Sequence, residues 1–299
     1  MYISKVPVEK GWSKDKKYRV TDEKGNDFLL RISPLEEYEA KKREYELMIQ
    51  LENLGIPMCR ALEFGTNEEG VYSVQTWIDG VDLRDVVDEL TEDEQYAYGF
   101  ESGKILQKIH SIPAPADVKD WEKYFSDKTD RKIRMYEECP IKFENGQAMI
   151  DFINAHRHLL KNRPQTFQHG DYHIGNMMLD KNKKLFIIDF NRSDFGDPWE
   201  EFNRIVWCAQ AAPMLATGMV NGYFDNQVPI KFWELLAFYI SSNTLSSVPW
   251  AIPYGEGEVK IMIDQAKDVL AWYDDMKNPV PTWYRGTVNY TSVEKMSLL

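Results

Sequence analysis

The stretch HGDYHIGNMMLDKNKKLFIIDF, residues 169–190, decides how the chain is expected to fold and where its chemistry lies. The apolar runs NMML and LFIID are separated by the polar residues DKNKK, a pattern that predicts two short strands joined by a tight hairpin. Asp171 and Asn176 stand on the loop that enters the first strand, and Asp189 ends the second. A hairpin brings these places side by side. Because Mg²⁺ binds carboxylate and carboxamide oxygens, the stretch predicts a magnesium site at Asn176 and Asp189.

A structural interpretation stands beside this one. Asp and Asn are common in turns because their side chains hydrogen-bond to nearby backbone, and HGD alone is a weak signal. The combination is more specific, since an Asn follows Asp171 by five positions and the Asp of IDF follows that Asn by thirteen. Phosphoryl transfer needs one residue that orients or deprotonates the hydroxyl and two metal ligands. Asp171, Asn176 and Asp189 supply that set.

HGDxxxxN followed by IDF resembles the catalytic core of the aminoglycoside phosphotransferase family, whose wider relatives include choline kinase. The resemblance extends over most of the chain. It implies an α+β, protein-kinase-like fold with two lobes, an antiparallel β-sheet N-lobe with one helix and a mainly helical C-lobe. It also implies that Asp171 is the catalytic base, that Asn176 and Asp189 bind Mg²⁺, and that ATP or GTP is the phosphate donor.

The local patterns agree with this organisation. Residues 1–78 are strand-rich: KKYRVTD (16–22) and DFLLRIS (27–33) predict a hairpin, a helix is expected within 35–55, and further strands follow around ALEFGT and VYSVQTWI. We expect this part to bind the nucleotide, and residues 79–299 to form the catalytic and substrate-binding lobe. There Thr91 and Glu94 predict a capping box that opens a helix running to about His110. Gly99 and Gly103 on that helix predict the close approach of another helix.

The resemblance assigns six residues to the nucleotide. Arg31 occupies the position where the family usually has Lys, and strand alternation aims it into a cleft; a charge on an edge strand is the alternative. Glu44 is the matching helix acid, with Glu37, Glu39 and Glu46 as alternatives, and Ser13 in GWSKDKKY lies in the turn over the phosphates. Backbone groups at the hinge would meet the adenine, although Trp77 can instead be interlobe packing. The six residues are Ser13, Arg31, Glu44, Thr76, Trp77 and Ile78.

GDPWEEF, residues 196–202, follows the second metal ligand. Asp197 predicts a helix N-cap, with Pro198 at the first helical position. The family commonly has a similar Asp-Pro turn in a structural role. Glu201 stands where a later Asp is usual.

Composition limits the partners. The 43% hydrophobic and 28% charged residues are typical of an ordinary globular protein, and the formal net charge of −12 argues against nucleic acid or an anionic membrane while mildly favouring a cationic ligand. The three cysteines are odd in number and widely spaced, which indicates a reducing compartment. The chain lacks the apolar stretch of a signal peptide or a membrane span, so a cytoplasmic location is expected.

Three functions remain open. The first is a kinase for a small, aminoglycoside-like molecule, of the type that confers antibiotic resistance. The second is a metabolic kinase for choline, a sugar or an amino-acid alcohol. The third is a non-catalytic nucleotide-binding protein, which the complete set of Asp171, Asn176 and Asp189 opposes. For the substrate, several acids can bind a polyamine or simply face solvent, and solvent is expected for each: Glu200, Asp264, Asp268, Asp274 and Asp275.

Overall fold

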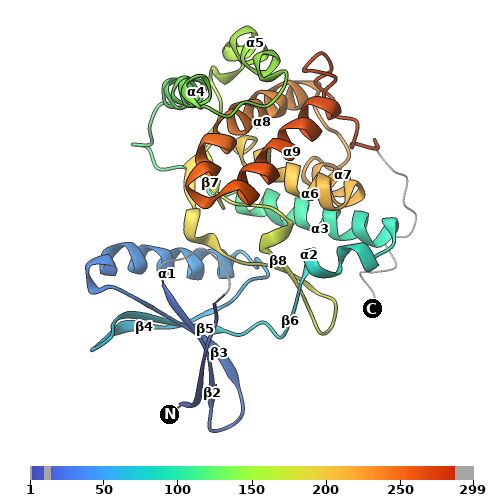
Figure 1. Cartoon of the computed structure of the whole chain (residues 1–299). Helices are drawn as coiled ribbons and strands as arrows, with labels where there is room; N and C mark the ends of the chain where they lie inside the picture. The colour runs from blue at the N-terminus through green and yellow to red at the C-terminus, as the bar shows by residue number, and fades with distance from the viewer. Residues whose placement is uncertain (1, 10–14, 287–299) are drawn as a thin grey trace. The chain divides into compact units, whose positions relative to one another are not determined.

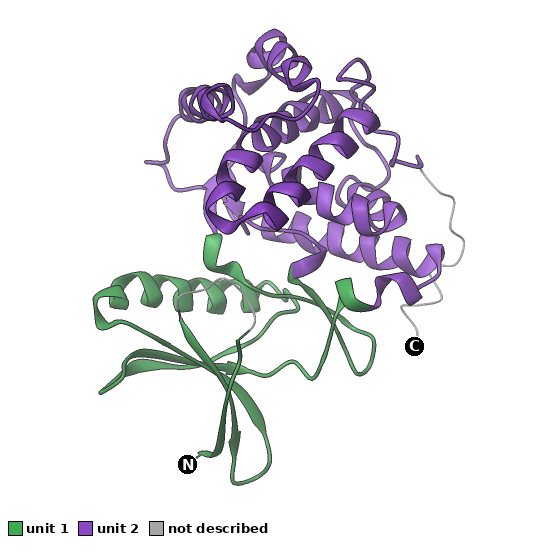
Figure 2. Cartoon of the chain, in the orientation of Figure 1, with its two compact units in different colours: residues 1–85, 176–192 green, residues 86–175, 193–299 purple. Residues whose placement is uncertain are grey.

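The computed structural model describes residues 2–9 and 15–286, and the contacts within it divide the chain into two compact units (Figure 2). The first unit comprises Met1–Asp85 and Asn176–Arg192, and the second comprises Val86–Gly175 and Ser193–Leu299. By these contacts the first continuous segment of the N-terminal unit ends at residue 85. The contacts also group residues 176–192, which contain the predicted hairpin of the opening stretch, with the N-terminal unit.

The first unit is built on a five-stranded antiparallel sheet with strand order β1-β2-β3-β5-β4 (Figure 1). The predicted hairpin of β2 and β3 is confirmed: the Asp22 carboxylate accepts the backbone N–H groups of Lys24 and Asn26, and Gly25 adopts a φ of +81°. Glycine tolerates this left-handed conformation without strain. The strands are β1 (Tyr2–Pro7), β2 (Lys16–Asp22), β3 (Asp27–Ser33), β4 (Ala61–Asn67) and β5 (Gly70–Thr76).

The two faces of this sheet differ, as strand alternation predicts. One face carries a hydrophobic cluster of Val20, Leu30, Ile32 and Val74. The opposite face carries Arg31 and Ser33, and helix α1 (Tyr38–Asn53), entered through the 3₁₀ turn η1 (Leu35–Glu37), packs near it through Met48 and Gln75, whose Sδ and Nε2 are 3.3 Å apart. Tyr38 and Tyr45, two turns apart on the helix, both pack on Phe64 of β4.

A second small sheet of the first unit, β6-β8-β9, contains the hairpin on which the sequence argument rests. The Asp180 carboxylate accepts the backbone N–H groups of Asn182 and Lys184 at 2.8 and 2.9 Å, and this side-chain-to-backbone pattern closes the turn. The predicted hairpin, formed by β8 (Met177–Asp180) and β9 (Leu185–Ile187), is confirmed. Strand β6 (Gly80–Asp82) pairs with β8, and the short 3₁₀ turns η4 (Ile174–Asn176) and η5 (Phe190–Arg192) flank the hairpin.

The second unit is mainly helical, with one two-stranded sheet of β7 (Thr166–Gln168) and β10 (Asp194–Gly196). Its central helix α8 (Ile230–Ala251) is largely buried. Helix α2 (Leu83–Val86) spans the division between the units. The remaining elements of the second unit are η2 (Val87–Glu89), α3 (Glu92–Ile109), α4 (Trp121–Glu138), α5 (Gly146–His156), η3 (Arg157–Leu160), η6 (Glu200–Arg204), α6 (Ile205–Ala211), α7 (Pro213–Tyr223), η7 (Ile252–Tyr254) and α9 (Glu256–Trp272).

Helix α3 confirms two predictions. The Thr91 side chain accepts the Glu94 N–H while the Glu94 carboxylate accepts the Thr91 N–H, which completes the capping box. Gly99 and Gly103 lie against α7: a Cβ on either would stand 2.1 Å from a backbone oxygen of that helix. In the part of the chain that the structure describes, no helix has the length and apolar character needed to cross a membrane.

Candidate active site

The loop HGD follows β7 and is held by a buried carboxylate of the second unit. His169 is fully buried, and Gly170 adopts a φ of +84°, a conformation that favours glycine. The Gly170 N–H donates to both carboxylate oxygens of Glu201, at 3.0 and 3.2 Å, and the Asp171 N–H donates to His169 Nδ1 at 3.3 Å. These hydrogen bonds therefore fix the backbone of the loop that carries Asp171.

Glu201 is charged although it is almost completely buried. Burial acts to raise the pKa of Glu201, but His110, His169 and the Gly170 N–H outweigh it, and the pKa lies below its usual value. His110 stands with Nε2 3.8 Å from the carboxylate and Nδ1 2.9 Å from the hydroxyl of Tyr223. The sequence treated Glu201 only as a departure from a pattern; the structure makes it the anchor of the loop.

Asp171 has two basic neighbours in its own unit. Its Oδ1 lies 3.3 Å from Arg204 Nε and 3.7 Å from His173 Nε2, and its side chain is 18% exposed. A nearby guanidinium favours the charged carboxylate, the form that can orient a hydroxyl or accept its proton. Sequence reasoning missed Arg204. A signal was present, because residues three apart share a face of a 3₁₀ helix, and η6 carries Glu201 and Arg204 at that spacing.

The two proposed metal ligands lie together in the first unit. The Asn176 carbonyl accepts the N–H of Ile188, at 3.0 Å, directly before Asp189. Asp189 has a φ of +68°, a left-handed conformation that non-glycine residues seldom adopt and that is enriched at functional sites. Among the described residues no group of three or more His, Cys, Asp or Glu side chains is placed to hold a metal. One Asn and one Asp suit Mg²⁺, which takes few protein ligands and completes its shell with phosphate and water.

The cation predicted on β3 is part of an ionic chain. Arg31 donates to Asp15 Oδ2 from Nη2 at 2.6 Å and Nε at 3.1 Å, and Lys41 lies 3.2 Å from the same oxygen. Lys41 also contacts Glu44 at 3.1 Å, so Asp15 and Lys41 link the two predicted residues. The edge-strand alternative for Arg31 is wrong, because β3 lies between β2 and β5 and the side chain is 14% exposed.

Lys17 is a cation beside Arg31 on this sheet that sequence reasoning missed. It stands directly across from Arg31 in the register of β2 and β3. Burial and the charge of Arg31 lower the pKa of Lys17, while the charges of Asp189 and Asp15 act in the opposite direction. The electrostatic influence of Asp189 places Lys17 near one proposed metal ligand.

The first hinge residue has backbone and side-chain contacts within the protein. Thr76 ends β5, and its N–H donates to the Arg60 carbonyl at 3.0 Å while its hydroxyl accepts the Arg60 N–H at 2.9 Å. The Thr76 N–H is therefore engaged by protein, and a contact of its carbonyl group with adenine stays a prediction. Trp77 lies under the Arg19 guanidinium, 5.1 Å from the ring centroid, and Ile78 is buried. Their backbone contacts to adenine stay predictions, and Ser13 lies outside the described residues.

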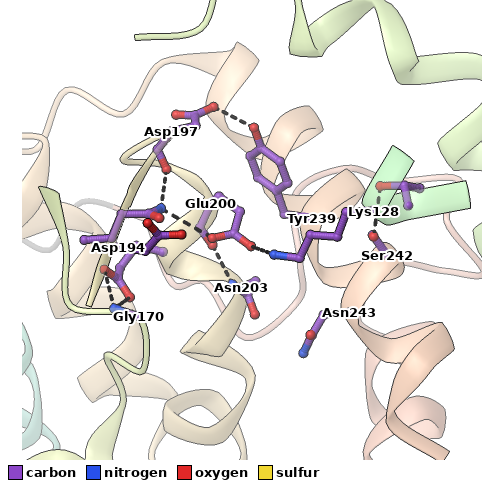
Figure 3. A network of polar contacts seen from close by, with 12 residues as sticks. Lys128, Gly170, Asp194, Asp197, Glu200, Asn203, Tyr239, Ser242 and Asn243 are labelled. Carbon is purple, nitrogen blue, oxygen red and sulfur yellow. Dashed lines mark hydrogen bonds and ion pairs between the residues drawn. The ribbon is translucent and has the colours of Figure 1, made fainter. Parts of the chain in front are cut away.

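Asp197 organises the core of the second unit (Figure 3). Its carboxylate accepts the Trp199 N–H, a bidentate pair from Arg163 at 2.6 and 2.9 Å, and the Tyr239 hydroxyl at 2.6 Å. The predicted N-cap at Asp197 and helix start at Pro198 are both wrong: η6 begins at Glu200 with Trp199 in the N-cap position, and Asp197 and Pro198 precede it in a turn that the Asp197–Trp199 hydrogen bond closes.

Glu200 does not face solvent as the sequence suggested. Its side chain is 15% exposed, and Figure 3 shows the ammonium of Lys128 directed at it, with an Nζ–Oε1 distance of 3.4 Å. Gln168 Nε2 approaches the other carboxylate oxygen at 3.3 Å, and Asn203 donates to the Glu200 backbone carbonyl. Glu200 is therefore neutralised inside the protein, and it is not a free anion for a polyamine.

Comparison with known proteins agrees with this geometry. Residues 6–233 match the sequence profile described as "APH: Phosphotransferase enzyme family". Among solved structures, aminoglycoside phosphotransferase APH(4)-Ia is similar with a TM-score of 0.65 at 15% identity, over 90% of this chain and 94% of that one. Its thermostable mutant in a ternary complex with AMP-PNP and hygromycin B has a TM-score of 0.64 at 15% identity, with the same coverage.

The GDP complex of an aminoglycoside 2′-phosphotransferase-IIIa mutant is similar with a TM-score of 0.67 at 11% identity, over 93% of this chain and 94% of that one. No protein of curated function matches the sequence significantly. At such identities the structural likeness shows the fold. The antiparallel sheet with its helix and the mainly helical remainder, expected from the sequence, are confirmed.

Proposed function

Because the chain belongs to the APH phosphotransferase enzyme family, we propose that it transfers the γ-phosphate of ATP or GTP to a hydroxyl group of a small molecule, with Mg²⁺. The observation that carries this proposal is the position of Asp171 beside Arg204 and His173, on a loop anchored by the buried charge of Glu201. A carboxylate held so rigidly and still partly exposed is suited to orient an incoming hydroxyl.

Each residue has a defined task in this reaction. Asp171 accepts a hydrogen bond from the acceptor hydroxyl, aligns its oxygen with the γ-phosphorus and receives its proton as the new O–P bond forms. The bond between the γ-phosphorus and the β–γ bridging oxygen breaks, and ADP or GDP leaves. Asn176 and Asp189 would hold Mg²⁺. When bound, the ion neutralises charge on the transferred phosphoryl group. Arg31, supported by the chain through Asp15, adds positive charge on the sheet, and the backbone at residues 77 and 78 would meet the base.

The alternative of a non-catalytic nucleotide-binding protein rests on Arg31 in place of Lys. Arg31 donates from two guanidinium nitrogens to one carboxylate oxygen of Asp15, so this position still carries a basic side chain in an ordered contact. The left-handed conformation of Asp189 is also costly for a residue without a role. Both features favour the enzyme.

For the acceptor, an aminoglycoside-like cation and a metabolic alcohol are both compatible with the family. Solved relatives are complexes with hygromycin B and with gentamicin, but at 15% identity these ligands do not transfer to this chain. The net charge of −12 favours a cation only at long range. Charges close to Asp171 decide the acceptor more directly, because exposed charges are screened beyond about 8 Å at physiological ionic strength.

The variant Asp171→Asn tests the proposal. It keeps the size of the side chain and removes the proton acceptor, so turnover should fall by about 10²–10⁴-fold while the Kd for the nucleotide stays within about twofold. Release of ADP or GDP and nucleotide binding are measured in parallel. Asp117→Asn, at an exposed position of the α3–α4 connection, is the control and should keep full activity. Equal turnover in Asp171→Asn and wild type would remove Asp171 from the mechanism.

A further inference from the structure

Helix α4 presents two lysines one turn apart that differ in their counter-charges. Lys128 is matched by Glu200, with its Nζ 3.4 Å from the carboxylate. Lys132 donates to the neutral amide oxygen of Asn243 on α8, at 3.2 Å. Within the described parts of the chain, no carboxylate lies within ion-pair distance of the Lys132 ammonium. A half-buried ammonium without a carboxylate is costly in folding free energy, which calls for a functional reason.

Most of the charges that act on Lys132 are positive. Its own helix contributes Lys128 and Arg131, and η6 contributes Arg204 and the acid Glu200. Burial and these cations lower the pKa of Lys132 to about 7, and Glu200 only partly compensates. An anion bound there would supply the missing counter-charge.

A series of contacts leads from α4 to Asp171. Lys128, one turn before Lys132 on α4, lies 3.4 Å from Glu200 on η6, and Arg204 on the same short helix lies 3.3 Å from the Asp171 carboxylate. Arg204 also acts electrostatically on Lys132. All of these groups belong to the second unit.

Resting on the proposed phosphotransfer, we propose that the acceptor carries an oxyanion, a carboxylate or a phosphate ester, and that Lys132 and Asn243 bind it while Asp171 holds its hydroxyl. An ammonium has three N–H donors, and Asn243 takes one of them, which leaves two for the oxygens of the ligand. Arg204 and Lys128 disfavour a polycation at the same place. The acceptor is accordingly an anionic alcohol rather than an aminoglycoside.

The first experiment compares matched acceptors with the full-length protein. Nucleotide turnover with Mg²⁺ is measured with hydroxy acids and hydroxyamino acids, with their carboxamides, with sugar phosphates and their parent sugars, and with choline and aminoglycosides. The inference predicts that a carboxylate or a phosphate stimulates turnover and that its uncharged counterpart does so at least about tenfold less in kcat/KM. Stimulation by the carboxylate acceptors or by the phosphate esters identifies which oxyanion the acceptor carries.

Two failures are distinguishable in this design. Slow nucleotide hydrolysis without acceptor, lost in Asp189→Asn, reports nucleotide cleavage at the proposed site independently of any acceptor. If the panel responds only to cationic or uncharged acceptors, the anionic-acceptor inference is overturned and the phosphotransferase stands. Hydrolysis that no acceptor stimulates counts against both. If hydrolysis and stimulated turnover are both missing, the proposed function fails as well.

The second experiment assigns the preference to Lys132. Lys132→Met keeps the length of the side chain and removes its charge, so the KM for the anionic acceptor should rise by about tenfold or more, with little change for the uncharged counterpart. Lys132→Arg keeps the charge and should retain the preference. Lys123→Met, on the exposed face of the same helix, is the matched control and should change neither. Equal effects of Lys132→Met on charged and uncharged acceptors, in protein that circular dichroism shows to be folded, would refute the assignment.

Discussion

At the scale of single residues, the most consequential side chain is one that contacts no substrate. Glu201 places a negative charge in the interior, where its carboxylate accepts the Gly170 N–H and lies beside His110. Its role was not readable from the sequence, because the partner atoms are a backbone N–H and a histidine 31 and 91 positions away. Asp171, by contrast, was identified from the local motif alone, although its partner Arg204 was not.

Glu201→Gln should reduce stability in a pH-dependent way. The folded-state pKa of Glu201 lies below its usual value, so its contribution is fully present above the unfolded-state pKa of about 4.3 and is lost as the pH falls through the lowered folded-state pKa. At pH 7 we expect the variant to lose about 1–3 kcal/mol in the free energy of unfolding. Urea unfolding of both proteins between pH 7 and pH 3 should show this difference shrinking toward the acid end. A difference that is constant with pH would show that Glu201 does not act through its charge.

We expect Lys132, which we propose as a ligand-binding residue, to lower the stability of the folded protein at neutral and acidic pH. Its folded-state pKa of about 7 lies below the unfolded value of about 10.4, so between these values the unfolded chain binds more protons and stability rises with pH. Lys132→Met should therefore raise the Tm, most at pH 7 or below, and the gain should disappear toward pH 10. Differential scanning calorimetry at pH 6.5 and 9.5 measures this. A loss of Tm that is equal at both pH values would contradict a strained lysine.

At the scale of elements, the sequence was most informative where a pattern is local. The β2–β3 and β8–β9 hairpins, the capping box of α3 and its glycine pair all depend on residues within a few positions of one another, and all were predicted. The start of η6 was misplaced, because Asp197 is bound by Arg163 and Tyr239 and so serves the core rather than a regular helix. The Arg31–Asp15–Lys41–Glu44 chain and the Lys132–Asn243 contact join distant segments, which no local pattern encodes.

Gly103→Ala tests the packing of α3 on α7. The new Cβ would stand 2.1 Å from the Met219 carbonyl oxygen and 2.6 Å from the Tyr223 nitrogen, both backbone atoms that cannot move aside. We expect a loss of about 1–3 kcal/mol or more in the free energy of unfolding. Gly257→Ala on α9 is the control, because nothing lies within 4 Å of its Cβ and alanine favours a helix by up to about 1 kcal/mol. Comparable denaturant midpoints for the two variants would rule out the close approach.

At the scale of the whole molecule, family membership defines the reaction type while the charge distribution bears on the acceptor. The total charge of −12 pointed to a cationic ligand, whereas Asp171 lies beside Arg204, which acts together with Lys128 on Lys132. A negative net charge and a locally positive site are compatible, because the net charge is a sum over the whole protein. A bound ligand responds mainly to charges within a Debye length. Composition alone did not reveal this local excess, since it depends on which helices pack together.

The most direct test of the central claim is to follow the γ-phosphate itself. ³¹P NMR of the protein with ATP, Mg²⁺ and the acceptor panel should show a new phosphomonoester resonance that is lost when EDTA removes the metal and in Asp171→Asn. A phosphomonoester that forms equally in Asp171→Asn, or inorganic phosphate as the only product with every acceptor, would contradict a phosphotransferase that works through Asp171.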